Sequence, residues 1–158
     1  MDKFSFETLR LIESHFKLNT SFRRKKNEPA EISCRITISH KKEDKTINVT
    51  VSVDSADKNQ PFNFDVAIMG SFKFSKLPQR RELERIVHIN CAAIIFPFVR
   101  ETIADLTRRA NIPPFHMEPM NFVALYENQM SQPSLSEKSH SQSSAKEGKV
   151  SEPSPQKP

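Results

Sequence analysis

Two pairs of side chains in this 158-residue chain have a spacing that chemistry at a site could use. The first is His88 and Cys91, which lie three residues apart and would place an imidazole and a thiol on one turn of a helix. Both groups are ligands for zinc, but a structural zinc site needs four ligands. The sequence offers no second pair at metal-site spacing, so we predict no metal.

The second pair is Glu101 and Asp105, four residues apart, so that two carboxylates could share one helix face. Arg108 and Arg109 follow closely, and a solvated face with ion pairs is the simpler interpretation. The lone Gly-Lys at 148–149 lacks the glycine-rich approach of a phosphate-binding loop. No Ser/His/Asp arrangement is supported either, so we predict a protein that is not an enzyme and needs no cofactor.

Clustered basic residues raise a different possibility. The net charge is +5, from 24 basic and 19 acidic residues, with cations concentrated at 22–26 ("FRRKK") and 76–85 ("KLPQRRELER"). Such a run could contact phosphates, but it more often forms a solvated loop. A nucleic-acid partner is therefore disfavoured and kept as an alternative, which a steep dependence of binding on salt would identify.

Composition divides the chain into two parts. Residues 131–158 are mostly Ser, Pro, Lys, Glu and Gln. Such a segment has too few apolar side chains to bury, so we expect a disordered tail after a folded domain at 1–130.

Two lone cysteines favour a reducing compartment, and the first residues do not resemble a signal peptide. The longest nearly apolar run, Cys91–Val99, is too short to span a bilayer. We therefore expect a cytoplasmic protein without membrane insertion.

The first half of the chain predicts strands. Apolar residues alternate with polar ones over 32–39, 47–54 and 62–74, and more weakly over 9–18, which is the pattern of half-buried antiparallel strands. The polar residues 40–45 predict the hairpin turn between the first two of these segments.

After Pro78 the period becomes helical. Mostly apolar residues recur at helical spacing and predict one face, or stripe, of a long helix. Asn111 and the two prolines that follow it should end this helix. Asn121 should cap a short second helix. We predict an α+β fold, with a four-stranded antiparallel sheet and one long and one short helix on one face. The stripe comprises Ile86, Ile89, Ala93, Phe96, Arg100, Ile103 and Thr107.

The middle of the long helix is apolar in every direction. Nine consecutive residues from Cys91 to Val99 would cover all sides of a helix at about 100° per residue. One side should pack on the sheet. The other should pack on a second subunit, or else the loop at 111–120 folds back and covers it within one chain.

Three motifs in this region resemble the SecB family of bacterial protein-export chaperones. They are "IIFPFVRE" at 94–101, "LTRRANIPPF" at 106–115 and "EPMNFVALY" at 118–126, and "FDVAIMGSFKF" at 64–74 resembles a strand of the family. The likeness is strong over 61–128, weak over 9–60 and absent from the tail.

The resemblance implies a homotetramer, built as a dimer of dimers that pack through their long helices. It also implies an ATP-independent holdase that keeps unfolded preproteins competent for export by the Sec pathway and passes them to the SecA motor. The family's groove for extended apolar segments lies between the sheet and the loop joining the two helices, here residues 111–120.

On this resemblance we expect two sets of site residues. Methionine suits a promiscuous apolar site because it is unbranched and polarizable, although all of these residues could equally be core beneath a long loop. The expected groove walls are Phe72, Phe74, Phe115, Met117, Met120, Phe122 and Tyr126. The expected subunit contacts are Ile89, Ala92, Ala93 and Phe96.

The chain departs from the family in charge. Export members tend to be acidic and bind SecA through acidic residues of the outer sheet face and a C-terminal tail, whereas this chain is basic and its tail lacks a recognisable SecA-binding end. SecA is therefore the less secure partner. The family also contains SecB-like chaperones dedicated to toxin–antitoxin pairs, so an antitoxin is the alternative client.

Overall fold

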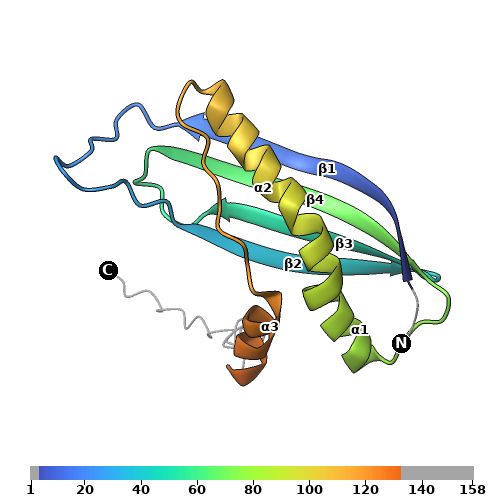
Figure 1. The fold of residues 1–158 in the computed structure, drawn as a ribbon. Coiled ribbons are helices and arrows are strands. Elements are labelled where there is room, and N and C mark those ends of the chain that lie inside the picture. The colour runs from blue at the N-terminus through green and yellow to red at the C-terminus, as the bar shows by residue number, and fades with distance from the viewer. Residues whose placement is uncertain (1–3, 133–158) are drawn as a thin grey trace, which may run out of the picture.

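A computed structural model describes residues 4–132. Of the predicted tail, 131–158, only the first two residues lie among them, and Ser131 belongs to the last helix. Four strands form one antiparallel sheet in the spatial order β1-β4-β3-β2, so that β1 and β2 are its edges (Figure 1). This confirms the predicted fold class. The strands are β1 (Phe4–Leu18), β2 (Cys34–Glu43), β3 (Thr46–Ser55) and β4 (Phe62–Phe74).

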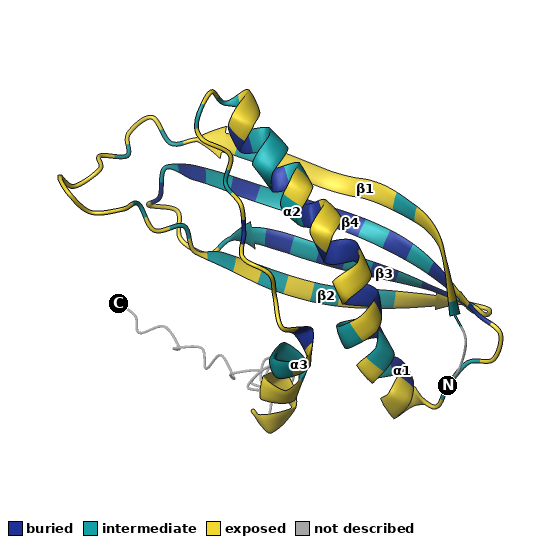
Figure 2. Ribbon diagram, viewed as in Figure 1, coloured by how far each residue is buried: buried dark blue, intermediate teal, exposed yellow. Residues whose placement is uncertain are grey.

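Alternation along the strands creates one buried and one solvated face. Val49, Val51 and Val53 of β3 are fully buried, whereas the residues between them are half-buried. Figure 2 shows the same alternation along β4. The predicted strands are confirmed, but the turn is shorter than the expected six residues. Glu43 pairs with Thr46, because Asp44 adopts a positive φ of 54° that a tight turn requires and aspartate tolerates.

Strand β1 begins five residues earlier than its alternation suggested. Its pairing with β4 shifts between Phe6 and Thr8 and again between Leu11 and Glu13. Each bulge places an extra residue in β1 and interrupts the period of two. The interruption explains why this strand gave the weakest sequence signal.

One continuous helix of 30 residues, Arg80–Arg109, crosses the inner face of the sheet and contacts β4 and β3 (Figure 1). It comprises α1 (Arg80–Ile86), a π-helical turn η1 (Val87–Cys91) and α2 (Ala92–Arg109). The short helix α3 (Phe122–Ser131) contacts η1.

The π turn changes which residues of the long helix face the sheet. A π turn takes more residues than an α turn, so the buried positions before η1 are displaced from those that a uniform period of 3.6 predicts. The stripe predicted with a uniform period of 3.6 was therefore wrong before Phe96. The buried positions are Leu83, Val87, Cys91, Ala92, Ile95, Phe96, Val99, Ile103 and Thr107.

The long helix exceeds what the apolar run Cys91–Val99 suggested. Within residues 4–132 it is the one helix whose length and mean hydropathy, 1.4 over its most apolar stretch, would permit it to cross a membrane. In this fold 39% of that stretch is buried, because the sheet covers one side of it. The helix is thus a core element of the domain.

The long helix lies close to the sheet at Gly70 of β4. A Cβ atom at this position would lie 3.0 Å from Cγ1 and Cδ1 of Ile95 and 3.0 Å from Cε2 of Phe72. These distances are shorter than ordinary van der Waals contact. The absent side chain of Gly70 therefore sets how near α2 lies to the sheet.

Candidate functional site

The inner face of β2 carries an apolar surface that the long helix leaves partly open. Ile32, Cys34, Ile36 and Ile38 are all half-buried, and we call these four residues the β2 strip. The partners of Ile36 and Ile38 on β3 are fully buried, because α2 contacts β3 and β4. Part of the core surface is therefore open along the β2 edge of the sheet.

The loop of residues 110–121 joins α2 to α3 and is fastened to the long helix at two points. The backbone N–H of Phe115 donates to Oγ1 of the buried Thr107 at 2.9 Å. Nε of Arg100 donates to the carbonyl oxygen of Met117 at 2.7 Å. Both bonds satisfy backbone groups that a loop would otherwise leave to water.

Aromatic contacts hold the same loop against the domain. The ring of Phe115 meets Phe62 of β4 edge-on at 5.8 Å, and Phe122 meets Phe96 of α2 edge-on at 5.3 Å. The side chain of Asn121 accepts a hydrogen bond from the first turn of α3 at 3.1 Å, which confirms the predicted cap. Hydrogen bonds and aromatic contacts thus hold the loop against the domain, with the rings of Phe115 and Phe122 packed on it.

A polar cluster links β2 to the helices at the end nearer α1. Oε1 of Glu84 lies 3.6 Å from Nε2 of His40 on β2, and its Oε2 lies 3.6 Å from Nδ1 of His88. The ring of His88 in turn lies 5.7 Å from that of Tyr126 on α3. Three elements meet here, which fixes α3 next to the long helix.

The predicted groove residues fall into two regions. Five of them lie on the loop and α3. Among these, Met117 and Phe122 are buried, Phe115 and Tyr126 are half-buried, and Met120 is 37% exposed.

Phe72 and Phe74 are not part of that group. They are 0% and 1% exposed, and their rings contact Phe4 and Phe6 of β1. As the domain stands, neither ring presents a surface to a ligand. Alternation along β4 predicts that Phe72 and Phe74 share one face of the sheet, but it does not predict that residues of β1 pack against their rings.

The predicted subunit contacts also divide. Ala92 and Phe96 are buried within the chain, Ile89 is half-buried and Ala93 is exposed. The large apolar side chains on the exposed side of α2 are instead Ile94 and Phe98, at 36% and 42%. Sequence analysis included neither of these two residues among the expected subunit contacts.

Strand β1 exposes a second apolar surface at the opposite edge of the sheet. Its hydrogen-bonding edge away from β4 has no partner strand within the described residues. An unpaired edge with apolar side chains is a template for another strand. Its exposed apolar residues are Phe6, Leu11, Ile12 and Leu18.

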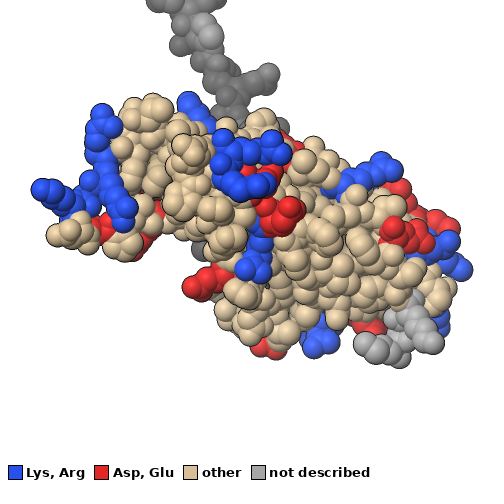
Figure 3. All heavy atoms as spheres, turned by 45° about the horizontal axis from the view of Figure 1, so that its top comes forward, with Lys and Arg blue, Asp and Glu red and all other residues tan. Residues whose placement is uncertain are grey.

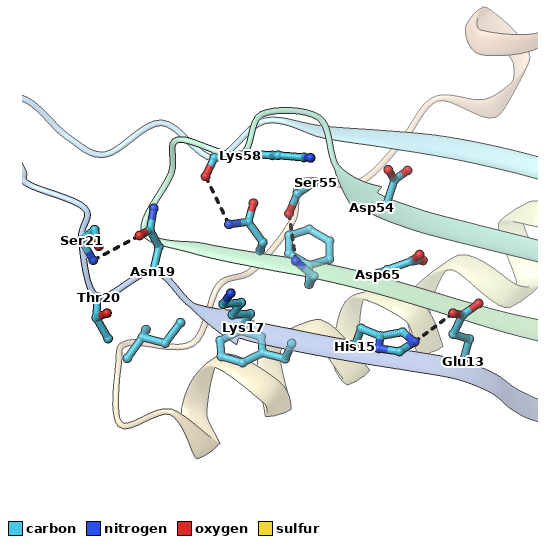
Figure 4. A pocket seen from close by; sticks show the side chains of 14 residues that line it. Glu13, His15, Lys17, Asn19, Thr20, Ser21, Asp54, Ser55, Lys58 and Asp65 are labelled. Carbon is cyan, nitrogen blue, oxygen red and sulfur yellow. Dashed lines mark hydrogen bonds and ion pairs between the residues drawn. The ribbon is translucent and has the colours of Figure 1, made fainter.

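The outer face of the sheet is polar and hollowed near the ends of β1 and β3 (Figure 4). The hollow of about 820 Å³ holds three carboxylates, Glu13, Asp54 and Asp65. Nε2 of His15 lies 2.9 Å from Oε1 of Glu13, and Nε of Arg35 donates to Asp54 at 3.2 Å. Asp54, and after it the nearby Asp65, raise the pKa of the Arg35 guanidinium, and Lys17 and Lys58 line the same hollow. This mixed lining does not suit an apolar ligand.

The two cysteine thiols, Cys34 and Cys91, are not activated as nucleophiles. Burial raises the pKa of the Cys91 thiol to about 12, and burial followed by the charge of Asp54 raises that of Cys34. A raised pKa keeps a thiol protonated and unreactive. Within residues 4–132 no group of three or more His, Cys, Asp or Glu side chains is placed to hold a metal ion.

Comparison with known proteins identifies the family. The model of the family described as preprotein translocase subunit SecB matches residues 11–133. The chain is 42% identical over 83 residues to the protein-export protein SecB of Methylobacillus flagellatus, a match covering 52% of each chain. It is 29% identical over 115 residues to that of Methylocella silvestris, covering 70% of this chain and 71% of the relative. The chain thus spans about half to seven tenths of these two relatives.

A solved structure shares the fold. It is a SecB-like chaperone of Mycobacterium tuberculosis in complex with a peptide from an antitoxin, with a TM-score of 0.63 and 16% identity. The match covers 74% of this chain and 90% of that one. Since the family model covers most of the chain and the sheet and helices agree with this fold, the chain belongs to the SecB family.

Proposed function

We propose that this protein is an ATP-independent holdase, not an enzyme, that binds unfolded polypeptides along the β2 strip and beneath the loop of residues 110–121. The carrying observation is the half-buried apolar β2 strip at an open sheet edge, in a chain of the SecB family. Such a surface binds apolar segments without regard to their order, because the hydrophobic effect is non-directional. In the cytoplasm it would keep preproteins unfolded for the Sec pathway.

An extended client would use two kinds of contact. Its backbone would add to the free edge of β2, and its alternate side chains would lie on the β2 strip. The walls would be those predicted on the loop and α3, with Met120 already exposed at 37%. Met117 and Phe122 are buried now, so the loop would have to shift outward for them to touch a client.

We propose a homotetramer as the working assembly. Strand β1 offers an unpaired edge for one interface, and the exposed side of α2 with Ala93, Ile94 and Phe98 offers a second. Two distinct self-complementary surfaces generate a dimer of dimers. In Phe98→Glu, light scattering after gel filtration should show half the mass of the wild type, and an unchanged mass would contradict the proposed helix interface.

Delivery to SecA is the less supported part of this function. The hollow on the outer face has carboxylates, but His15 and Arg35 pair with two of the three. Lys17 and Lys58 line the same hollow, so a partner attracted by acidic residues would find little net negative charge there. Co-purification with SecA tests delivery independently of client binding.

Light scattering that monitors the aggregation of an unfolded client tests the proposed holdase activity. The wild type should suppress aggregation, and Ile36→Glu should weaken client affinity roughly tenfold or more, as loss of one buried aliphatic contact implies. Thr37→Glu is the matched control, because it adds the same charge one residue away on the opposite face of β2. A wild type that does not slow aggregation, or equal losses in both variants, would refute the proposal.

A single dedicated client is the second candidate. The chaperone of Mycobacterium tuberculosis with the same fold was solved with an antitoxin peptide, and the charge of this chain departs from that of the export members. Pull-down from the cells that make the protein separates the two functions. Many preproteins would support general export, whereas one dominant small client without SecA would support an antitoxin.

A further inference from the structure

A basic arm extends from the end of the sheet at which β1 finishes. Residues 19–33 cross from β1 to β2, and the crossing projects beyond the sheet in Figure 1. Its tip carries Arg23, Arg24, Lys25 and Lys26 in succession, all of them exposed. Figure 3 shows Lys and Arg side chains gathered at this end of the molecule.

The root of the arm is fixed by Gln60, which is only 2% exposed. The N–H of Ser33 donates to Oε1 of Gln60 at 3.1 Å, and Nδ2 of Asn19 donates to its carbonyl oxygen at 3.0 Å. The N–H of Asn19 donates to the carbonyl oxygen of Pro61 at 2.9 Å. Both ends of the arm are therefore tied to the segment that leads into β4.

That segment also touches the proposed client site. Phe62 follows Pro61 directly, and its ring contacts Phe115 of the loop between the long helix and α3. Ile32, the first residue of the β2 strip, lies next to Ser33 at the other root of the arm. A chain leaving the β2 strip at this end would therefore pass the root of the arm.

The tip has a defined turn that presents the cations outward. Asn27 adopts a φ of 69°, and the N–H of Glu28 donates to the carbonyl oxygen of Lys25 at 3.4 Å. Nε of Arg24 donates to the carbonyl oxygen of Glu28 at 3.1 Å, which leaves its other N–H groups available. The two lysine ammonium groups have no hydrogen bond to any described residue.

The four cations are not neutralised within residues 4–132. The ion pairs of that part of the chain involve other residues, and the arm itself contains two acids, Glu28 and Glu31. Neighbouring like charges repel each other, and an anionic ligand would relieve this repulsion. The chemistry that fits the tip is a short row of carboxylates or phosphates.

A peptide fits the surroundings better than a nucleic acid does. Proteins that bind nucleic acid combine several phosphate contacts with aromatic side chains on which bases stack. The one aromatic residue of the arm, Phe22, is half-buried, and the tip offers four cations. An apolar strip with cations at its end instead matches a polypeptide with an apolar segment followed by acidic residues.

We propose that the basic arm selects clients in which an acidic stretch directly flanks the apolar segment bound on the β2 strip. This inference rests on the proposed holdase function and names the substrate class of that site. The acidic stretch would lie along the tip cations, where contacts are exposed and therefore sensitive to salt.

The test compares three labelled peptides with one apolar core and a flank of four Asp, four Ser or four Lys residues. At low ionic strength the Asp flank should bind the wild type roughly tenfold more tightly than the Ser flank, as a few exposed ion pairs imply. The ratio should fall to about one in Lys25→Glu/Lys26→Glu and at high salt. Lys41→Glu/Lys42→Glu, on exposed residues near the β2–β3 turn, is the matched control and should keep the ratio.

The outcomes of this test distinguish failure of the proposed role of the arm from failure of the proposed holdase function. Equal binding of the Ser and Asp flanks, or a preference that survives Lys25→Glu/Lys26→Glu, overturns the role of the arm and leaves the holdase intact. Failure of every peptide to bind overturns both. If a single-stranded oligonucleotide displaces the Asp-flanked peptide and binds more tightly than it in a salt-dependent way, the arm is a nucleic-acid site and the inference is overturned.

Discussion

Replacing Gly70 by alanine should loosen the domain at the point where the long helix meets the sheet. The new Cβ would lie 3.0 Å from two atoms of Ile95, and Ile95 is fully buried, so it has little room to move. No glycine among the described residues has a positive φ, so the backbone at this position accepts alanine. The effect of the substitution is therefore one of packing.

Two opposing terms set the size of the effect. Overpacking a buried site costs about 1–3 kcal/mol. Replacing a glycine at a compatible φ returns about 0.4–1 kcal/mol by restricting the unfolded chain. The net loss in the free energy of unfolding for Gly70→Ala should thus be about 1–2 kcal/mol.

A double-mutant cycle tests whether the contact with Ile95 is the cause. Ile95→Ala alone should cost about 2–5 kcal/mol because it leaves a cavity. It also removes both Ile95 atoms that the new Cβ meets, so the double variant should be about 1 kcal/mol more stable than the sum of the single effects.

Urea unfolding at one fixed protein concentration is the assay, since subunit association would make the midpoint depend on concentration. With a slope of about 2 kcal/mol/M, Gly70→Ala should lower the midpoint by about 0.5–1 M. An unchanged midpoint, or strictly additive effects in the cycle, would refute the close approach of α2 to β4.

Three further predictions concern the loop, an ion pair and the thiols. Asn121→Ala removes the cap of α3 and should destabilise that helix by about 1 kcal/mol, seen as faster hydrogen exchange in α3 while the sheet is unaffected. Hydrogen bonds from Arg109 and Arg108 lower the pKa of Asp105, so its contribution to stability is present above the ordinary value of 3.8 and is lost as the pH falls below it. Asp105→Asn should flatten the loss of stability below pH 3.8 in acid titrations, and an unchanged slope would contradict the pairing. A thiol reagent at neutral pH should modify Cys34 before Cys91, which is fully buried and should react only on unfolding.

Much of the fold follows from periodicity. Burial alternates along most of β2, β3 and β4, and the end of the long helix and the cap at Asn121 use residues with strong local preferences. The parts that escaped are those in which an extra residue enters a regular element. The bulges of β1 and the π turn η1 each leave the composition unchanged while shifting the face that later residues occupy.

The candidate site was predicted less completely because burial depends on neighbours. Phe72 and Phe115 are equally apolar in the sequence, yet Phe72 is fully buried in the core against Phe4 and Phe6 of β1, and Phe115 is half-buried in the loop. Nor does the sequence show that Gln60 ties the arm to the root of β4, since its partners, such as Asn19 at 41 residues' separation, are distant in the chain. Contacts of this range are fixed by topology and not by local pattern.

The π turn η1 also bears on how this helix tolerates changes in length. Each residue of an α-helix advances the chain by about 100°, so one residue added to a regular helix would rotate everything on one side of it out of place. A wide turn absorbs such a residue locally, so that the helix on either side keeps its orientation. The half before η1 is aligned with His40 and the half after it with Gly70. Deleting one residue from η1 should therefore leave a regular α-helix in which Glu84 still faces β2 and α2 still packs on the sheet.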